Sequence, residues 1–285
     1  MLWLNLLING LVWGCALGMV AVSFSLIFAT TRFFHVAHAA VYSLCGYVTW
    51  SMVKHGLPEW AALAFGIVVC GIVGGLIQKL LYERLDRRGA THLVILIASL
   101  GLAAVMQNAL AATYTSNVLQ FGLPWGNRTM SIGGVLLSNT QLLTVAFGIA
   151  SYFGALWFAH RTALGKRMRA VASNPFLAEI TRLQPRQVHI AVMAIGSALV
   201  CIPGVLVPLD LGLQPVGGVP ILLTATIAVI SGGVGSISGA FLLAVVIAVL
   251  QNLSLLFMPG EWSIGITFGI FVIFMLFRPR GLFAG

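Results

Sequence analysis

The sequence carries very little charge. Only 7% of its 285 residues are charged and 60% are hydrophobic, with a mean hydropathy of +1.04, whereas soluble proteins are about 25% charged. So few charged side chains cannot cover the surface of a water-soluble domain of this length. Because one membrane-spanning helix takes about 20 mainly apolar residues, the chain has room for roughly eight to ten spans. The sequence therefore predicts an all-α polytopic membrane protein.

Paired cysteines are also missing. Cys15, Cys45, Cys70 and Cys201 each stand alone in an apolar stretch, and no C-x-x-C pair occurs. This spacing indicates neither a disulfide framework nor a zinc knuckle. Each cysteine is therefore predicted to be a small buried apolar side chain.

Coupling carboxylates and nucleotide motifs are missing as well. All the acidic residues fall in loops or at the ends of apolar runs: Glu59, Glu83, Asp86, Glu179, Asp210 and Glu261. Ion-coupled transporters normally keep a carboxylate within the bilayer. The phosphate-binding pattern G-x-x-x-x-G-K-[ST] does not occur either. We therefore expect no enzyme, no catalytic residue, and no cofactor or metal on this chain, and a transporter of this kind would take its energy from other chains.

What is present is a series of long apolar runs. Nine segments are candidate spans: 4–29, 33–53, 60–78, 93–114, 142–159, 190–207, 219–230, 237–257 and 264–277. Two are weaker, because His35 and His38 interrupt 33–53 and the run 219–230 is short. This gives about eight or nine transmembrane or half-membrane helices. If 33–53 crosses the bilayer, the two termini lie on opposite sides, and if it is re-entrant they lie on the same side.

The basic residues gather in three places. Twelve of the fifteen lie in segments 79–92 and 161–188 and in the tail after 277. The positive-inside rule places all three in the cytoplasm, including the C-terminus. The net charge of +9 is thus a topology signal rather than a nucleic-acid surface. We expect one transmembrane domain over 1–285 with a cytoplasmic loop at 161–188.

The cytoplasmic loop contains a short amphipathic pattern. Asn174 suits an N-cap and Pro175 the first helical position. The apolar positions recur at helical spacing, and the charged ones lie off that face: Phe176, Leu177, Ile180 and Leu183, against Glu179 and Arg182. Two interpretations remain open, an interfacial helix on lipid headgroups and a docking helix for a cytoplasmic partner.

The segment 231–239, SGGVGSISG, breaks the apolar pattern with four glycines and three serines. Each glycine costs about 1 kcal/mol in a helix interior. One interpretation is a broken helix on a substrate route, as in many transporters, and the other is a tight turn at the cytoplasmic interface. Ser236 and Ser238 have no placed base, so small-residue helix packing explains them better than an intramembrane protease. His35 and His38 alone make a poor metal site and favour polar packing.

Several stretches resemble the permease family of ATP-binding-cassette importers for branched-chain amino acids, in its shorter subunit type. The stretches are GGVGSISGA (232–240, family GGIGSIPGA), SLGLAAVMQN (99–108), GKRMRA (165–170), IGSALVCIPGVL (195–206) and LFRPRGL (276–282). They follow the family order over nearly the whole chain.

The resemblance implies a permease subunit in the bacterial inner (plasma) membrane. Its partners would be a second, similar permease, two cytoplasmic ATPases that bind ATP and Mg²⁺, a periplasmic substrate-binding protein and membrane lipid, with no nucleic acid. The implied ATPase-coupling residues are Asn174, Pro175, Phe176, Leu177, Glu179 and Arg182. The expected substrate-pathway residues are Thr224, Thr226, Gly232, Gly233, Gly235, Ser236, His38, Gln107 and Asn108.

Two departures concern the substrate. Ala39 and Ala40 stand where the family has Gly-Glu in N-F-A-H-G-E, and Thr224 stands where it often has Lys. Both changes remove charge from the pathway. The expected solute is a branched-chain amino acid, or urea, a short amide or a small organic acid, which other members of the family carry. An uncoupled channel or facilitator for a small neutral solute is the alternative.

Overall fold

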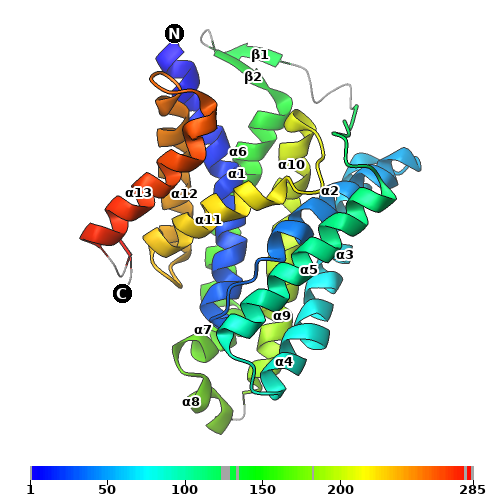
Figure 1. Cartoon of the computed structure of the whole chain (residues 1–285), viewed down its shortest axis with the longest axis vertical. Helices are drawn as coiled ribbons and strands as arrows, with labels where there is room; N and C mark the ends of the chain where they lie inside the picture. Colours follow the sequence, from blue (N-terminus) through cyan, green and yellow to red (C-terminus); the bar gives the residue numbers. More distant parts are fainter. Residues whose placement is uncertain (1, 123–128, 133–134, 182, 279–280, 284–285) are drawn as a thin grey trace.

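The structure is a computed structural model that describes residues 2–122, 129–132, 135–181, 183–278 and 281–283 (Figure 1). Its helices are α1 (Leu2–Thr31), α2 (His38–Lys54), α3 (Glu59–Ile77), α4 (Glu83–Arg87), α5 (His92–Thr113), α6 (Asn139–Arg161), α7 (Ala163–Ser173), α8 (Pro175–Ile180), α9 (Pro185–Leu199), α10 (Cys201–Leu211), α11 (Gly218–Gly232), α12 (Ile237–Ser254) and α13 (Ser263–Phe277). Within the described ranges, seven helical segments are long and apolar enough to cross a membrane. The predicted all-α polytopic fold is confirmed.

The two weak segments of the sequence contain two short helices, α2 and α11. Helix α2 has 17 residues and α11 has 15. At a rise of about 1.5 Å per residue they are roughly 25 and 22 Å long, less than the bilayer core of about 30 Å. In Figure 1, α11 runs obliquely through the middle of the protein. Both helices are therefore shorter than the bilayer core is thick.

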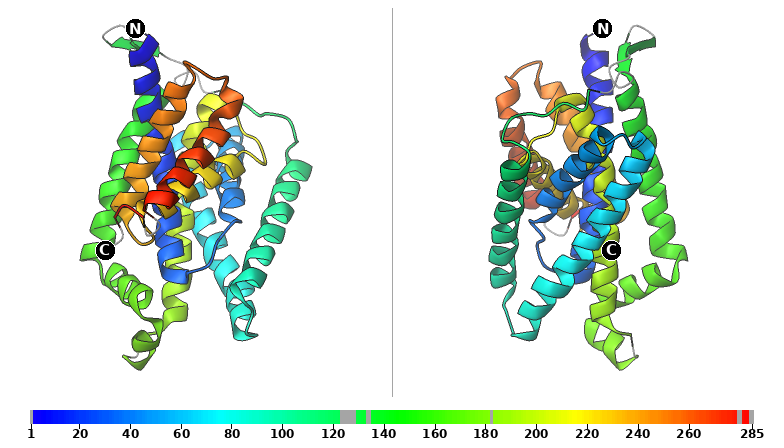
Figure 2. Two further views of the ribbon diagram at one scale, coloured as in Figure 1. Left: turned by 60° about the vertical axis from the view of Figure 1, so that its left-hand side comes forward. Right: turned by 90° about the vertical axis from the view of Figure 1, so that its right-hand side faces the viewer.

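Two of the three basic segments, 79–92 and 161–188, lie at one end of the molecule. Helices α4, α7 and α8 extend from the end opposite the N-terminus (Figures 1 and 2). Helix α1 runs toward that end and α2 turns back from it. This is the arrangement expected when segment 33–53 returns across the membrane, with the N-terminus opposite the basic loops.

Helix α1 forms the centre of the fold and packs against α6, α9, α11 and α12. Two glycines four residues apart permit a close backbone approach: a Cβ on Gly10 or Gly14 would lie 2.8 Å from the Cα of Val249 or Val245. Membrane helices associate through such small residues because lipid provides no hydrophobic drive between them. The α1–α12 pair is thus a close backbone contact.

Helical structure extends further into the charged segments than the apolar runs predict. Helix α3 continues through a π-helical turn, η1 (Gln78–Tyr82), into α4, and α7 occupies much of the predicted loop 161–188. Thr162 caps α7 by accepting a hydrogen bond from the Gly165 amide at 3.0 Å. The prediction followed hydropathy, which marks the membrane boundary but not the end of a helix. An antiparallel hairpin of β1 (Thr129–Ile132) and β2 (Val135–Ser138) precedes α6.

The cysteines require a correction. All four are buried as predicted, but Cys45 and Cys201 form a disulfide. They are 156 residues apart, so spacing along the chain gave no sign of the pair. Packing of α2 against α10 brings the two sulfur atoms together.

Candidate functional site

A central cavity of about 310 Å³ lies among α1, α2, α10, α11, α12 and the start of α13. Its lining is mainly apolar, and none of the described residues around it is charged. The polar side chains on its wall include Tyr42, Ser43, Thr224 and Gln251. Small-molecule sites are typically cavities of this size with apolar walls and a few placed polar groups.

Two residues of this wall have hydroxyl groups without a hydrogen-bond partner in the described part of the chain. Tyr42 Oη and Ser43 Oγ are buried and have no hydrogen-bond partner among the described residues. By contrast, the Thr224 hydroxyl donates to the Pro220 carbonyl at 3.1 Å. A buried polar group without a hydrogen-bond partner destabilises the fold by about 1–3 kcal/mol. A polar ligand that supplied a partner to Tyr42 or Ser43 would remove this penalty.

A second hollow of about 430 Å³ adjoins the cavity on the N-terminal side of the molecule. The two share Trp13, Val207 and Leu211 in their walls. We call this hollow the outer vestibule. It is more polar, with Asn9, Gln141, Asp210 and Asn252 in its lining. Asp210 is the acidic residue in this lining, and its carboxylate accepts a hydrogen bond from the Thr140 hydroxyl.

A third hollow of about 500 Å³, the inner hollow, lies near α7 and the turn between α11 and α12. Its lining includes Ser25, His160, Arg169, Gly235 and Ser236. The three hollows lie one after another along α1. Asn9 borders the outer vestibule, Leu17 the central cavity and Ser25 the inner hollow.

A packed layer separates the central cavity from the inner hollow. Every residue of α1 from Gly18 to Phe24 is buried, and a Cβ on Gly18 would lie 2.6 Å from the Phe241 ring. His38 belongs to this layer, because its Nε2 lies 2.9 Å from Ser23 Oγ. The cavity therefore adjoins the vestibule and is closed toward the end that carries α7 and α8.

The glycine-rich segment is a tight turn. Gly233 and Gly235 have φ values of +104° and +92°, which favour glycine. Ser236 caps α12 by accepting from the Gly239 amide at 3.0 Å. A Cβ on Gly232 would lie 2.4 Å from the Gly239 carbonyl group. Of the two open interpretations, the geometry matches the turn, and the turn borders the inner hollow rather than the central cavity.

The other pathway candidates lie in different places. Thr226 is buried in α11 and its hydroxyl has no partner among the described residues. Gln107 and Asn108 lie on α5, which stands at the edge of the bundle far from α6 (Figure 2). Asn108 is exposed and donates to the Ala104 carbonyl at 2.8 Å. The structure thus brings Thr224 to the cavity wall but does not bring Gln107 or Asn108 there.

The two histidines make separate polar contacts, as the packing interpretation expects. His35 Nδ1 lies 2.7 Å from Tyr82 Oη, and Tyr82 donates to Ser99 Oγ at 2.8 Å. Ser99 also accepts from the Ala37 amide at 3.0 Å. This network ties the connection before α2 to η1 and α5. Sequence reasoning missed Tyr82, as it missed Tyr42, Ser43 and Gln251, although each is a polar residue inside or next to an apolar run.

Helix α8 presents an apolar surface at the end of the molecule. Phe176, Leu177 and Ile180 are 70%, 56% and 63% exposed. Asn174 caps the helix by accepting from the Leu177 amide at 3.1 Å, and Pro175 opens it. Glu179 is exposed, and Arg182 lies outside the described residues.

One part of the predicted amphipathic helix is wrong. The helix ends at Ile180, and Leu183 lies half-buried against the core instead of continuing the exposed face. The Thr181 hydroxyl donates to the Ala178 carbonyl at 2.9 Å, and the Leu183 amide bonds to the same carbonyl at 3.0 Å. These bonds turn the chain back toward α9.

A bundle of long apolar helices around a solute-sized cavity, with a helix displayed at one end, is compatible with a membrane permease. The chain belongs to the family of permease components of branched-chain amino acid transport systems, whose sequence model matches residues 6–275. It is 26% identical over 296 residues to the high-affinity branched-chain amino acid transport system permease protein BraD of Pseudomonas aeruginosa, covering 98% of this chain and 95% of BraD. It is 22% identical over 294 residues to the corresponding protein LivH of Escherichia coli K12, covering 98% and 95%.

A solved structure supports the fold. PsaBC from Streptococcus pneumoniae in complex with Fab matches with a TM-score of 0.53 at 14% identity, covering 95% of this chain and 91% of that one. The predicted family and the predicted permease class are therefore confirmed.

Proposed function

We propose that this chain is the membrane-spanning permease subunit of an ATP-driven importer and passes a small organic solute into the cytoplasm. The central cavity carries the proposal, because it has the size of a small-solute site and two unpaired buried hydroxyls. The names of the relatives favour a branched-chain amino acid. Urea, short amides and small organic acids are the other solutes to test.

The solute would enter at the outer vestibule and reach the cavity beside Trp13. The layer around Ser23 and His38 would open for release toward the inner hollow, which the glycine turn borders. In this scheme Thr224 contacts the solute, while Thr226 and Gly232 to Ser236 support the moving helices. Gln107 and Asn108 lie on α5, outside this route.

Energy would come from other chains. Of two ATPases that bind ATP and Mg²⁺, one would dock on α8 of this chain, where Phe176 and Leu177 are exposed and Asn174 and Pro175 fix the start of the helix. Glu179 would make polar contacts at the edge of this interface, and Arg182, also chosen from the sequence, lies outside the described residues. A second permease and a periplasmic binding protein complete the assembly, with α8 and the C-terminus on the cytoplasmic side of the bacterial inner membrane.

The test is uptake of labelled leucine, valine, urea and a short amide by cells that lack their own carriers for these solutes. The chain is expressed with its genomic neighbours that encode an ATPase, a second permease and a binding protein. We expect uptake of one solute class that disappears when the ATPase lysine of the phosphate-binding loop is replaced. Uptake that persists at the same rate without ATPase activity would replace the proposal with an uncoupled channel.

A further inference from the structure

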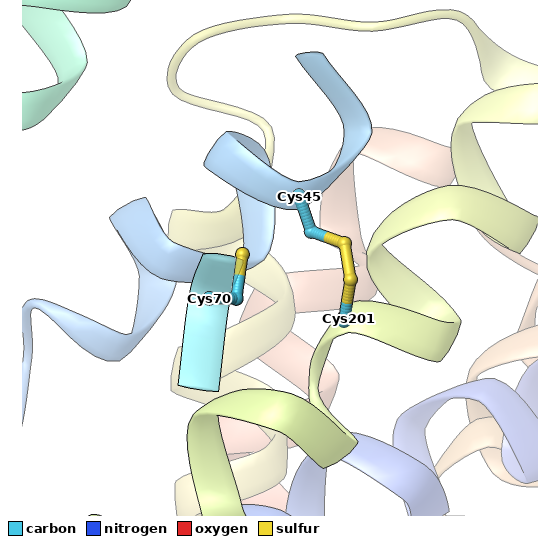
Figure 3. Close-up of side chains that lie close together, drawn as sticks. All are labelled: Cys45, Cys70 and Cys201. Carbon is cyan, nitrogen blue, oxygen red and sulfur yellow. A yellow bond between two sulfur atoms is a disulfide. The ribbon is translucent and has the colours of Figure 1, made fainter. Parts of the chain in front are cut away.

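Three buried cysteines meet where α2, α3 and α10 pack together. Cys45 of α2, Cys70 of α3 and Cys201 of α10 have their sulfur atoms within 4.8 Å of one another, and Cys45 and Cys201 are joined (Figure 3). Cys70 carries a free thiol. All three are completely buried. The permease activity proposed above uses none of them.

The disulfide joins two walls of the cavity. Cys45 lies on α2 shortly after Tyr42 and Ser43, which line it, and Cys201 begins α10, whose residues Val207 and Pro208 line it from another side. The two helices already touch closely, since a Cβ on Gly204 would lie 2.5 Å from the Tyr42 carbonyl oxygen. The bond therefore fixes a joint between cavity walls.

The bond limits how far these walls can separate. The Cα atoms of Cys45 and Cys201 are 5.2 Å apart, and disulfides rarely span more than about 6.8 Å between Cα atoms. With the bond intact, α2 and α10 can part at this level by less than about 2 Å. Without it, only apolar packing and backbone contacts hold the joint.

We propose that Cys45 and Cys201 form a redox tether that, when oxidised, holds α2 against α10 and slows passage through the cavity, and, when reduced, releases it. The inference rests on the proposed transport function. Reduction consumes a dithiol: one of its thiolates attacks a sulfur of the pair, its second thiol resolves the mixed disulfide, and Cys45 and Cys201 end as thiols. Re-formation passes two electrons and two protons from the thiols to a lipid-soluble quinone, which becomes a quinol.

Helix α3 covers the tether and limits access to it. Gly66 and Cys70, one turn apart on α3, face the sulfurs, and a Cβ on Gly66 would lie 3.2 Å from Cys45 Sγ and 3.5 Å from Cys201 Sγ. A reagent reaches the bond only when α3 moves away from α2 and α10. Reduction by neutral dithiothreitol should therefore be slow at rest and faster during turnover.

The first experiment maps the thiols by alkylation of the denatured protein with N-ethylmaleimide and mass spectrometry. The chain has four cysteines, of which Cys15 and Cys70 are free, so two should be labelled without reduction and four after it. Cys70→Ala should have one labelled cysteine without reduction and three after it. The double variant Cys45→Ala, Cys201→Ala should have two labelled cysteines in both conditions. Labelling of all four without reduction in oxidised membranes, or a bond to Cys70, would overturn the tether.

The second experiment measures uptake by the full assembly in proteoliposomes treated with diamide or dithiothreitol. Reduced wild type and reduced Cys70→Ala should transport several-fold faster than their oxidised forms, whereas the double variant should transport at one rate in both. Equal rates for oxidised and reduced wild type would refute the switch. If no form transports any solute, the proposed function fails instead. Amide hydrogen exchange of residues 38–54 and 201–211 then tests the tether separately from transport. Reduction must raise the exchange rate of these residues in wild type and leave it unchanged in the double variant.

Discussion

Arg32 donates a hydrogen bond from its Nη2 to the carbonyl oxygen of Ala172 at 2.9 Å, across 140 residues of sequence. Arg32 directly follows α1 and adopts a left-handed conformation with φ of +59°. Ala172 lies in the last turn of α7, two residues before the Asn174 cap of α8. The bond thus connects the start of the α1–α2 connection, which leads to His35 and His38, with the segment that displays the proposed coupling surface.

Loss of this bond should weaken coupling rather than folding. We expect Arg32→Ala to lower uptake roughly 2- to 10-fold, as loss of one hydrogen bond worth about 0.5–1.5 kcal/mol would do. Membrane yield and melting temperature should stay close to wild type because the side chain is exposed. Lys166→Ala is the control, since it removes an exposed positive charge from α7 without touching this bond. Equal loss of uptake in both variants would assign the effect to charge alone.

The exposed side chains of α8 should bind the ATPase. Phe176→Ala and Leu177→Ala should each reduce ATPase co-purification by roughly tenfold or more, as at other apolar interface anchors. Phe153→Ala serves as a matched control, because Phe153 is 62% exposed on α6, away from α8. Pull-down with a tagged ATPase measures the effect. Full retention of the ATPase by both α8 variants would place the docking surface elsewhere.

The contact between Gly232 and Gly239 should be sensitive to a single methyl group. In Gly232→Ala the new Cβ would overlap backbone atoms of Gly239 at 2.4 Å, which cannot move aside as a side chain would. We expect a clear fall in melting temperature and in uptake. Gly101→Ala on α5 is the control, because nothing lies within 4 Å of its Cβ, and alanine there should be neutral or stabilising by up to about 1 kcal/mol.

Gly235 tests the conformation of the turn without a clash. The nearest atom to a Cβ at this position is Ala29 Cβ at 3.9 Å, so Gly235→Ala has room for its methyl group. The positive φ alone should cost about 1–2 kcal/mol, seen as a modest fall in melting temperature. Gly235→Leu should also obstruct the inner hollow and lower uptake further than Gly235→Ala. Wild-type uptake with leucine at this position would show that the solute does not pass the turn.

The unpaired hydroxyls of the cavity should matter for transport more than for stability. Tyr42→Phe and Ser43→Ala remove buried groups that have no partner among the described residues, so melting temperatures should be unchanged or higher. Uptake should fall through a raised KM, because each hydroxyl would bind the solute. Tyr47→Phe is the control: Tyr47 is also buried with an unpaired hydroxyl but does not line the cavity. If Tyr47→Phe lowered uptake by the same amount, the effect of Tyr42→Phe and Ser43→Ala could not be assigned to solute binding.

Much of the fold could be predicted from the sequence, because hydropathy acts locally. All nine apolar segments became largely helical, with 190–207 divided between α9 and α10, and the two weak segments, 33–53 and 219–230, contain α2 and α11. Helix caps at Asn174 and the turn at Gly233 also follow from local chemistry. The extension of α3 into α4 and the presence of α7 did not follow, since hydropathy stops at the first charges while backbone hydrogen bonding continues.

The candidate site was predicted only in part. Thr224 was found, because it marks a departure from the family pattern, and it does line the cavity. Tyr42, Ser43 and Gln251 were missed, since polar residues scattered through apolar helices give no sign of which ones face each other. Gln107 and Asn108 were chosen from a motif, and the structure places them on the outlying α5.

The sequence by itself determined the multi-pass membrane character of the chain and the positions of its apolar helices, because bilayer solvation acts on each segment separately. Only the tertiary structure decided which helices surround a cavity, where that cavity is closed, and that Cys45 meets Cys201. Those relations depend on packing between segments up to 156 residues apart, and small residues such as Gly10, Gly14 and Gly204 set that packing by letting particular backbones approach.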